Sequence, residues 1–190
     1  MTESTARGLV YEGRLPLVWS ERGAAPSESE LAHTESANLD ILRTLLILET
    51  QTGNPSEDAQ DLESETIARL DFKLNLLLEL VGQLFAQHQL IPNAHPLTLT
   101  TAALRWQDSV SPSIDSLVRI DLYCSMKYPH PVVLHGRVEE RIAEVAGWTI
   151  GAALYGMGET VQEELERFIF VHHRRAVAQS RRRRAPPEQC

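Results

Sequence analysis

The histidines and arginines near the end of the chain are the residues whose types and spacing come nearest to a chemical site. His172 and His173 precede Arg174 and Arg175, and paired histidines could serve metal binding. Adjacent residues of a helix point in different directions, so this pair cannot form the two-histidine face of a metal site. The chain also has no G-x-S-x-G motif, no phosphate-binding loop and no paired cysteine ligands. The sequence therefore predicts that the protein is not an enzyme and holds no metal ion.

Arginine dominates the C-terminal segment of an otherwise acidic chain. The formal net charge is -8, although Arg174, Arg175 and the run at 181–184 place six positive charges there. Arginine runs followed by Pro-Pro seldom fold, so residues 181–190 are expected to form a disordered basic tail. The alternative is a patch that attracts nucleic acid, an acidic partner or a phosphate ligand. The tail lacks aromatic residues for base stacking, which makes nucleic acid a weak alternative.

Length and composition suit a single domain with a sizeable core. The chain has 190 residues, of which 43% are hydrophobic and 23% are charged, and we expect one domain over residues 1–180. No apolar run approaches the roughly 18 residues of a membrane span, and the N-terminus shows no secretory signal. Cys124 and Cys190 do not resemble a disulfide framework. These features predict a cytoplasmic protein.

The hydrophobic pattern changes its period along the chain and predicts both strands and helices. A strand over residues 8–19 precedes two helices, over residues 29–52 and 61–89, which Gly53 and Pro55 separate. Segments rich in β-branched and aromatic residues then predict further strands, over residues 97–106, 116–125, 131–144 and 147–156. A helix with acidic residues at its start and arginines at its end follows them. The predicted class is α+β, with five or six antiparallel strands.

This order of elements, together with five sequence segments, resembles the atypical PilZ family whose members assemble as tetramers through a long inserted helix. The segments are "GRLPLVW" (13–19), "RLDFKLNLLLELVGQL" (69–84), "LTLTTAALRW" (97–106), "YPHPVVLHGRV" (128–138) and "ELERFIFVHHRRAVA" (164–178). The resemblance implies a six-stranded antiparallel PilZ-type β-barrel, with two long helices inserted after strand one over residues 28–90 and a C-terminal helix. It also implies a role in bacterial cyclic di-GMP signalling, where it suggests motility, adhesion and virulence.

Cyclic di-GMP is the one ligand that the resemblance implies. Ordinary PilZ domains hold it with an RxxxR segment before the barrel and a D/N-x-S-x-x-G segment on an early strand. The second segment aligns with "TLTTAA", which puts Thr98, Thr100 and Ala103 at the three key positions. Upstream, Arg7 and Arg14 are seven residues apart instead of four. The polar groups of the ligand would thus lack charge-assisted hydrogen bonds worth about 1.5 to 3 kcal/mol each. We therefore predict a degenerate cyclic di-GMP motif.

The second predicted helix carries an apolar stripe that could face the protein's own core or another copy of the chain. Read in sevens, the a and d positions of the stripe hold Ile67, Leu70, Leu74, Leu77, Val81, Leu84 and His88. The neighbouring Leu78, Leu80 and Phe85 widen it beyond a two-stranded seam. We expect helix 61–89 to be an oligomer interface, and the resemblance favours a homotetramer. A buried helix in a monomer is the alternative.

Taken together, the residues and the resemblance favour a non-enzymatic signalling or adaptor protein that self-assembles and binds an unidentified signalling protein. A genuine cyclic di-GMP receptor with a noncanonical site is the first alternative, in which phosphate contacts would come from Arg7, Arg14, Arg174 and Arg175. A nucleic-acid-binding protein that uses the arginine tail is the second.

Overall fold

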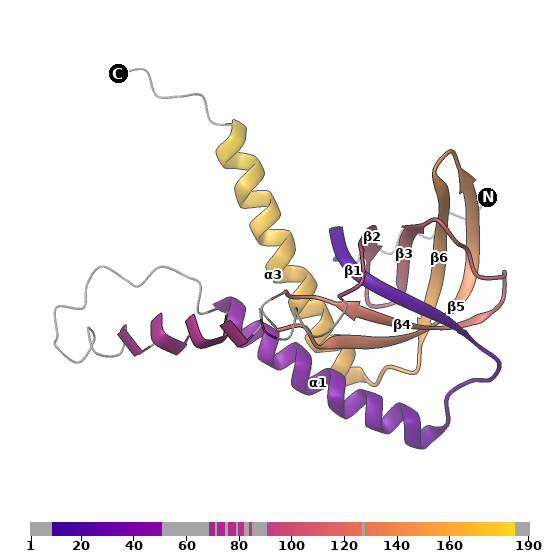
Figure 1. The fold of residues 1–190 in the computed structure, drawn as a ribbon, viewed down its shortest axis with the longest axis horizontal. Coiled ribbons are helices and arrows are strands. Elements are labelled where there is room, and N and C mark those ends of the chain that lie inside the picture. Colours follow the sequence, from indigo (N-terminus) through magenta and orange to yellow (C-terminus); the bar gives the residue numbers. More distant parts are fainter. Residues whose placement is uncertain are drawn as a thin grey trace.

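Six antiparallel strands form a closed barrel against which two helices pack (Figure 1). The computed structural model describes residues 9–50, 69, 70, 72–74, 76–78, 80, 81, 84, 91–126 and 128–184. The strands are β1 (Tyr11–Arg22), β2 (Ala94–Leu99), β3 (Ala103–Asp108), β4 (Leu117–Tyr123), β5 (Pro131–Glu144) and β6 (Gly147–Tyr155). Around the barrel their order is β1-β2-β3-β6-β5-β4, and all neighbours are antiparallel. The predicted α+β class with a six-stranded antiparallel barrel is confirmed.

Strand β1 closes the barrel because its two halves pair with different strands. From Tyr11 to Pro16 it pairs with β2, and from Leu17 to Arg22 it pairs with β4. Pro16 stands at the switch between the two ladders, where a residue without a backbone N–H is tolerated. The strand extends three residues past the predicted end, because the β4 ladder continues to Arg22.

Residues 97–106 form a hairpin instead of the single strand that the sequence predicted. Strand β2 ends at Leu99 and β3 begins at Ala103. Between them, the Thr100 hydroxyl oxygen accepts hydrogen bonds from the backbone N–H groups of Ala102 (3.2 Å) and Ala103 (2.9 Å). A threonine that satisfies nearby backbone groups favours a turn over a continuous strand.

Helices α1 (Glu28–Thr50) and α3 (Glu159–Arg184) pack on each other and on the barrel. Helix α1 begins with a capping box, in which Ser27 Oγ accepts from the Glu30 N–H (3.2 Å) and the Glu30 carboxylate accepts from the Ser27 N–H (2.8 Å). The hydrogen bond from the Ser27 backbone, together with one from Arg22, lowers the pKa of Glu30 to about 2. The ionised carboxylate thus caps the helix at neutral pH.

One hydrophobic core fills the barrel and continues under both helices. Its largest fully buried side chains from the barrel include Leu17, Leu99, Trp106, Ile120, Leu134 and Ile150. Helix α1 adds Leu42 and Leu45. Helix α3 adds an apolar stripe at helical spacing, which consists of Val161, Leu165, Phe168 and Ile169.

Helix α3 continues to Arg184 and so includes residues 181–184, which the sequence placed in a disordered tail over 181–190. Two physical reasons explain the longer helix. Arginine has high helix propensity, and no proline occurs between Glu159, where α3 begins, and Pro186. Positive charge near a helix C-terminus is also favourable. Residues 185–190 lie outside the described residues.

The described residues between 69 and 84 are helical and extend away from the barrel on the side where α1 ends (Figure 1). They fall within the helix predicted over 61–89. In the described part of the chain, none of the helices combines the length and apolar character that a membrane crossing requires.

The side-chain amide of Asn38 fastens α1 to the barrel. Its Nδ2 donates to the Val133 carbonyl (2.8 Å), and its Oδ1 accepts from the Val133 N–H (2.9 Å). The β5–β6 ladder ends at the pair His135 and Tyr155, so Val133 lies beyond the end of β6. The buried amide therefore takes the place that a neighbouring strand would fill.

Replacing Asn38 with alanine should leave both backbone groups of Val133 unpaired in a partly buried place. We expect the free energy of unfolding to fall by about 1 to 3 kcal/mol, measured by urea denaturation. The control is Ser36→Ala on the exposed face of α1, which should change it by less than about 0.5 kcal/mol. Equal stabilities of the two variants would contradict the fastening role.

His135 is buried where β5, β6 and α1 meet, with 4% of its surface exposed. Within the described part of the chain, neither its ring nitrogens nor the Tyr155 hydroxyl makes a hydrogen bond, and the two ring centroids lie 6.2 Å apart. Burial lowers the pKa of His135, and the cations Arg22 and Arg119 lower it further. The neutral ring is therefore the form that the folded protein favours.

Acidification should destabilise the fold through His135. Because the pKa in the folded state is lower than the usual value of about 6.5, the unfolded state binds more protons, and stability falls as the pH drops below that value. Glu30 and Asp121 act against the shift without reversing it. We expect His135→Leu to lose less thermal stability than the wild type between pH 7 and pH 5. The exposed His33→Leu should keep the wild-type pH dependence.

Candidate functional site

Cross-strand neighbours on the outer face of the barrel form a row around the first residue of the predicted nucleotide motif. Thr98 in β2 lies between Glu12 in β1 and Arg105 in β3. The row continues through Gly151 in β6 to Glu140 in β5. We call these five residues the Thr98 row. Their neighbours along β2, β3 and β6 are buried in the core, so the row faces solvent.

Thr100 and Ala103, the other two motif positions, lie at the β2–β3 turn, so one hairpin carries all three. The Thr100 hydroxyl donates to the Ala103 carbonyl (3.2 Å) in addition to accepting from two backbone N–H groups. Its hydrogen-bonding capacity is thus used within the turn. Ala103 is exposed at the start of β3, with a methyl group where the family motif has glycine.

Charge along the Thr98 row is unfavourable for an anion. Arg105 forms an ion pair with Glu140 across Gly151. A larger residue at Gly151 would crowd this pair, since a Cβ there would lie 3.3 Å from the Glu140 side chain. Glu12 stands on the other side of Thr98. Two carboxylates therefore accompany one guanidinium, and that guanidinium is already paired, so the row carries more negative than positive charge.

The arginines proposed to contact phosphate are not gathered around this row. The guanidinium of Arg14 donates to the Ala94 carbonyl (2.8 Å), at the far end of β2 from the motif. Arg174 and Arg175 are exposed on α3, and Arg7 lies outside the described residues. Among the residues that the structure describes, no three His, Cys, Asp or Glu side chains come together as a possible metal site.

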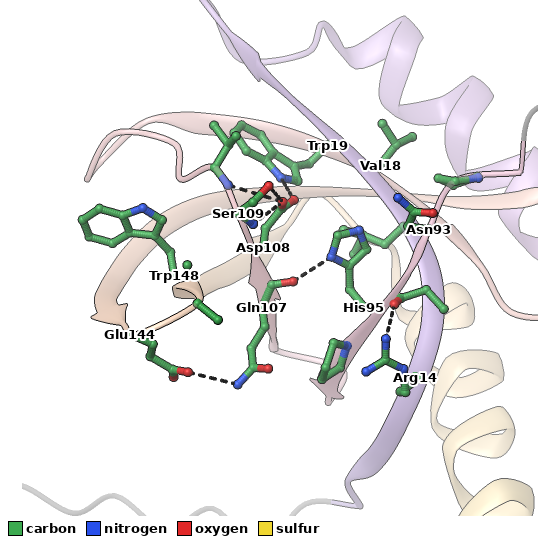
Figure 2. Close-up of a pocket in the computed structure, with 17 residues that line it drawn as sticks. Arg14, Val18, Trp19, Asn93, His95, Gln107, Asp108, Ser109, Glu144 and Trp148 are labelled. Atoms are coloured by element: carbon green, nitrogen blue, oxygen red, sulfur yellow. Dashed lines mark hydrogen bonds between the residues drawn. The ribbon is translucent and has the colours of Figure 1, made fainter.

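A cavity of about 660 Å³ opens at that far end, and sequence reasoning missed it (Figure 2). It forms because the β2–β3 ladder stops after three residue pairs, beyond which the strands diverge. Across the gap, His95 Nδ1 lies 2.7 Å from the Gln107 carbonyl oxygen. We call the cavity the tryptophan groove, since it is lined by Trp19 and Trp148 together with residues of β1, β2, β3 and the β5–β6 hairpin.

Hydrogen bonds hold the floor of the tryptophan groove in place. Trp19 Nε1 donates to Asp108 Oδ2 (2.8 Å), and Asp108 Oδ1 accepts from the Ser109 N–H (2.6 Å). The Arg141 guanidinium lies 4.4 Å from the Trp148 ring centroid. Two tryptophans in strand segments were the signal available in the sequence. The divergence that makes the groove arises only when the strands pair.

The apolar stripe of the predicted interface is exposed in the single chain. Its described members, Leu70, Leu74, Leu77, Val81 and Leu84, are between 46% and 57% exposed. Four further apolar side chains of this segment are also exposed, namely Phe72, Leu76, Leu78 and Leu80. Ile67 and His88, which complete the predicted stripe, lie outside the described residues. The described part of the stripe is therefore not core of its own chain.

The fold and these surfaces define the class of protein: a small antiparallel β-barrel domain with a helical insertion after its first strand. The chain belongs to the atypical PilZ family, because the family model tPilZ, "Atypical PilZ domain, cyclic di-GMP receptor", matches residues 42–182. The resemblance seen in the sequence is thus confirmed.

A solved structure with the same fold is the crystal structure of a pathogenic protein from Xanthomonas campestris, described as a new tetrameric PilZ domain self-assembled via an unusual helical bundle. It is 22% identical with a TM-score of 0.73, and the match covers 91% of this chain and 92% of that chain. No curated protein matches the chain.

Proposed function

We propose that the chain is a non-enzymatic signalling module of the cytoplasm that assembles through its inserted helix and acts by binding another protein. The nine exposed apolar side chains from Leu70 to Leu84 carry this proposal. Burying a leucine contributes about 1.5 to 3 kcal/mol, so a helix with this composition gains much from a partner. The heptad spacing of the stripe suits a second copy of the same helix.

A tetramer is the assembly that we favour. Apolar residues outside the a and d positions, such as Leu78 and Leu80, would remain in water in a two-stranded coil. The similar Xanthomonas campestris structure is described as tetrameric through a helical bundle, which supports the same arrangement here. A closed barrel leaves no strand edge for pairing between copies, so the helix is the natural place for association.

The proposed module carries a degenerate nucleotide site. Support comes from the Thr98 row, where Arg105 is paired with Glu140 and Glu12 adds a second carboxylate. The second candidate function is a cyclic di-GMP receptor with a noncanonical site, which the description of the matched family favours. Calorimetry separates the two candidates.

Replacing Leu74 and Leu77 together with aspartate should abolish assembly, because charged residues at a and d positions cannot be buried between helices. We expect light scattering to report the mass of a single chain, 21.3 kDa, with an unchanged circular dichroism spectrum of the barrel. The matched control is Ile114→Asp with Val145→Asp, which alters two exposed apolar residues of the barrel loops. The same mass for the wild type and the Leu74/Leu77 variant would refute the interface.

Cyclic di-GMP is titrated into the wild type at concentrations that would reveal a dissociation constant of about 10 µM, which is a binding free energy of roughly -7 kcal/mol. We expect no saturating heat. The variant Glu12→Gln with Glu140→Gln removes both carboxylates of the Thr98 row, and we expect affinity to rise by about tenfold or more. Glu163→Gln with Glu166→Gln, on the exposed side of α3, is the charge-matched control. Saturating heat with the wild type that Thr98→Ala abolishes would establish the receptor function instead.

A further inference from the structure

We propose that the tryptophan groove binds a proline-containing segment, and that its occupant is the stretch 185–187, with the sequence A-P-P, of a second copy of this chain. The inference rests on the proposed self-assembly, which supplies the second copy. The groove lies at the opposite end of β2 from the nucleotide motif and is independent of it.

The walls of the groove suit proline rings. Figure 2 shows Trp19 and Trp148 toward one side of the groove, with Arg14 and Asn93 toward the other. Next to the indoles, Val18 and Val110 leave 47% and 61% of their surfaces exposed. Grooves lined by aromatic side chains bind proline-rich segments in the polyproline II conformation, whose rings pack against the aromatic faces at low entropic cost.

The hydrogen-bonding groups of the groove also favour this conformation over an added strand. Pro96 has no N–H to offer on the β2 side, and His95 already contacts the Gln107 carbonyl on the β3 side. The Asn93 amide and the Trp148 indole N–H donate to no residue in the described part of the chain. A polyproline II segment makes no internal hydrogen bonds, so its carbonyls can accept from these two donors.

The chain contains one Pro-Pro pair, Pro186–Pro187, and only Ala185 separates it from the arginine run at 181–184. The groove is lined by the carboxylates of Asp108 and Glu144, which outnumber the guanidinium of Arg14 and so favour the neighbouring positive charge. Helix α3 ends at Arg184, away from the β5–β6 hairpin that forms one wall of the groove (Figure 1). Three further residues span at most about 10 Å, so the occupant comes from another copy.

The test uses a fluorescent peptide of residues 179–190, labelled at Cys190, and the chain truncated after Arg184. Fluorescence polarisation should show saturable binding that Trp148→Ala weakens by about tenfold or more, as expected for a tryptophan that anchors a ligand. Phe170→Ala, which truncates an exposed aromatic residue of α3, is the matched control and should leave binding unchanged. Equal binding to the two variants would overturn the proposal.

Two comparisons identify what the groove recognises. A peptide with Pro186→Ala and Pro187→Ala should bind about tenfold more weakly than the natural peptide, whereas equal binding would mean that arginine alone is attracted to the acidic chain. The full chain should bind the natural peptide more weakly than the truncated chain, because its own segment competes at high effective concentration. Equal affinity of the full and truncated chains would overturn the named occupant.

The same peptide separates this inference from the proposed assembly. The groove belongs to the barrel, so the Leu74→Asp/Leu77→Asp variant of the truncated chain should bind the peptide as the unaltered truncated chain does. Loss of assembly therefore leaves the titration intact. Absence of peptide binding by a chain that still assembles would overturn the groove proposal alone.

Discussion

The closure of the barrel through β1 is the constraint on which the rest of the structure depends. One strand of twelve residues pairs with β2 along its first half and with β4 along its second, and the switch falls at Pro16. Closure leaves no free strand edge at this seam. It also brings Glu12 beside Thr98, and Trp19 within hydrogen-bonding distance of Asp108. The surfaces on either end of the β2–β3 hairpin thus both include residues of β1.

Because the barrel is closed and its interior is filled, the inserted helix is where we propose that copies of the chain associate. Helix α1 leads into that insertion, and the barrel holds it through Leu42, Leu45 and the Asn38 amide. These contacts hold α1 against the barrel, since a buried amide with both partners in place is costly to displace.

The outer face of the hairpin supports the degenerate nucleotide site that we propose for this member of a family described as cyclic di-GMP receptors. The residues at the three motif positions lie in β2 and at the β2–β3 turn, so the hairpin that carries the motif is present. Their side chains serve other purposes: Thr100 completes the turn, and Arg105 neutralises Glu140 across Gly151. A polar row of this kind stabilises neighbouring strands, although it leaves little positive charge for phosphate.

Local pattern determined much of this protein from the sequence alone. The period of apolar residues predicted α1 and strands β4, β5 and β6 close to their observed bounds, because burial of one face is a local property of helices and strands. The described helical residues between 69 and 84 lie within the helix predicted over 61–89. The motif residues Thr98, Thr100 and Ala103 were predicted by resemblance, and they do share one hairpin. Only the tertiary structure decided which side chains meet across strands. The Arg105–Glu140 pair joins residues far apart in the chain, the tryptophan groove arises where two strands diverge, and Asn38 finds Val133 through packing. Such contacts depend on strand order and register, which no local spacing encodes.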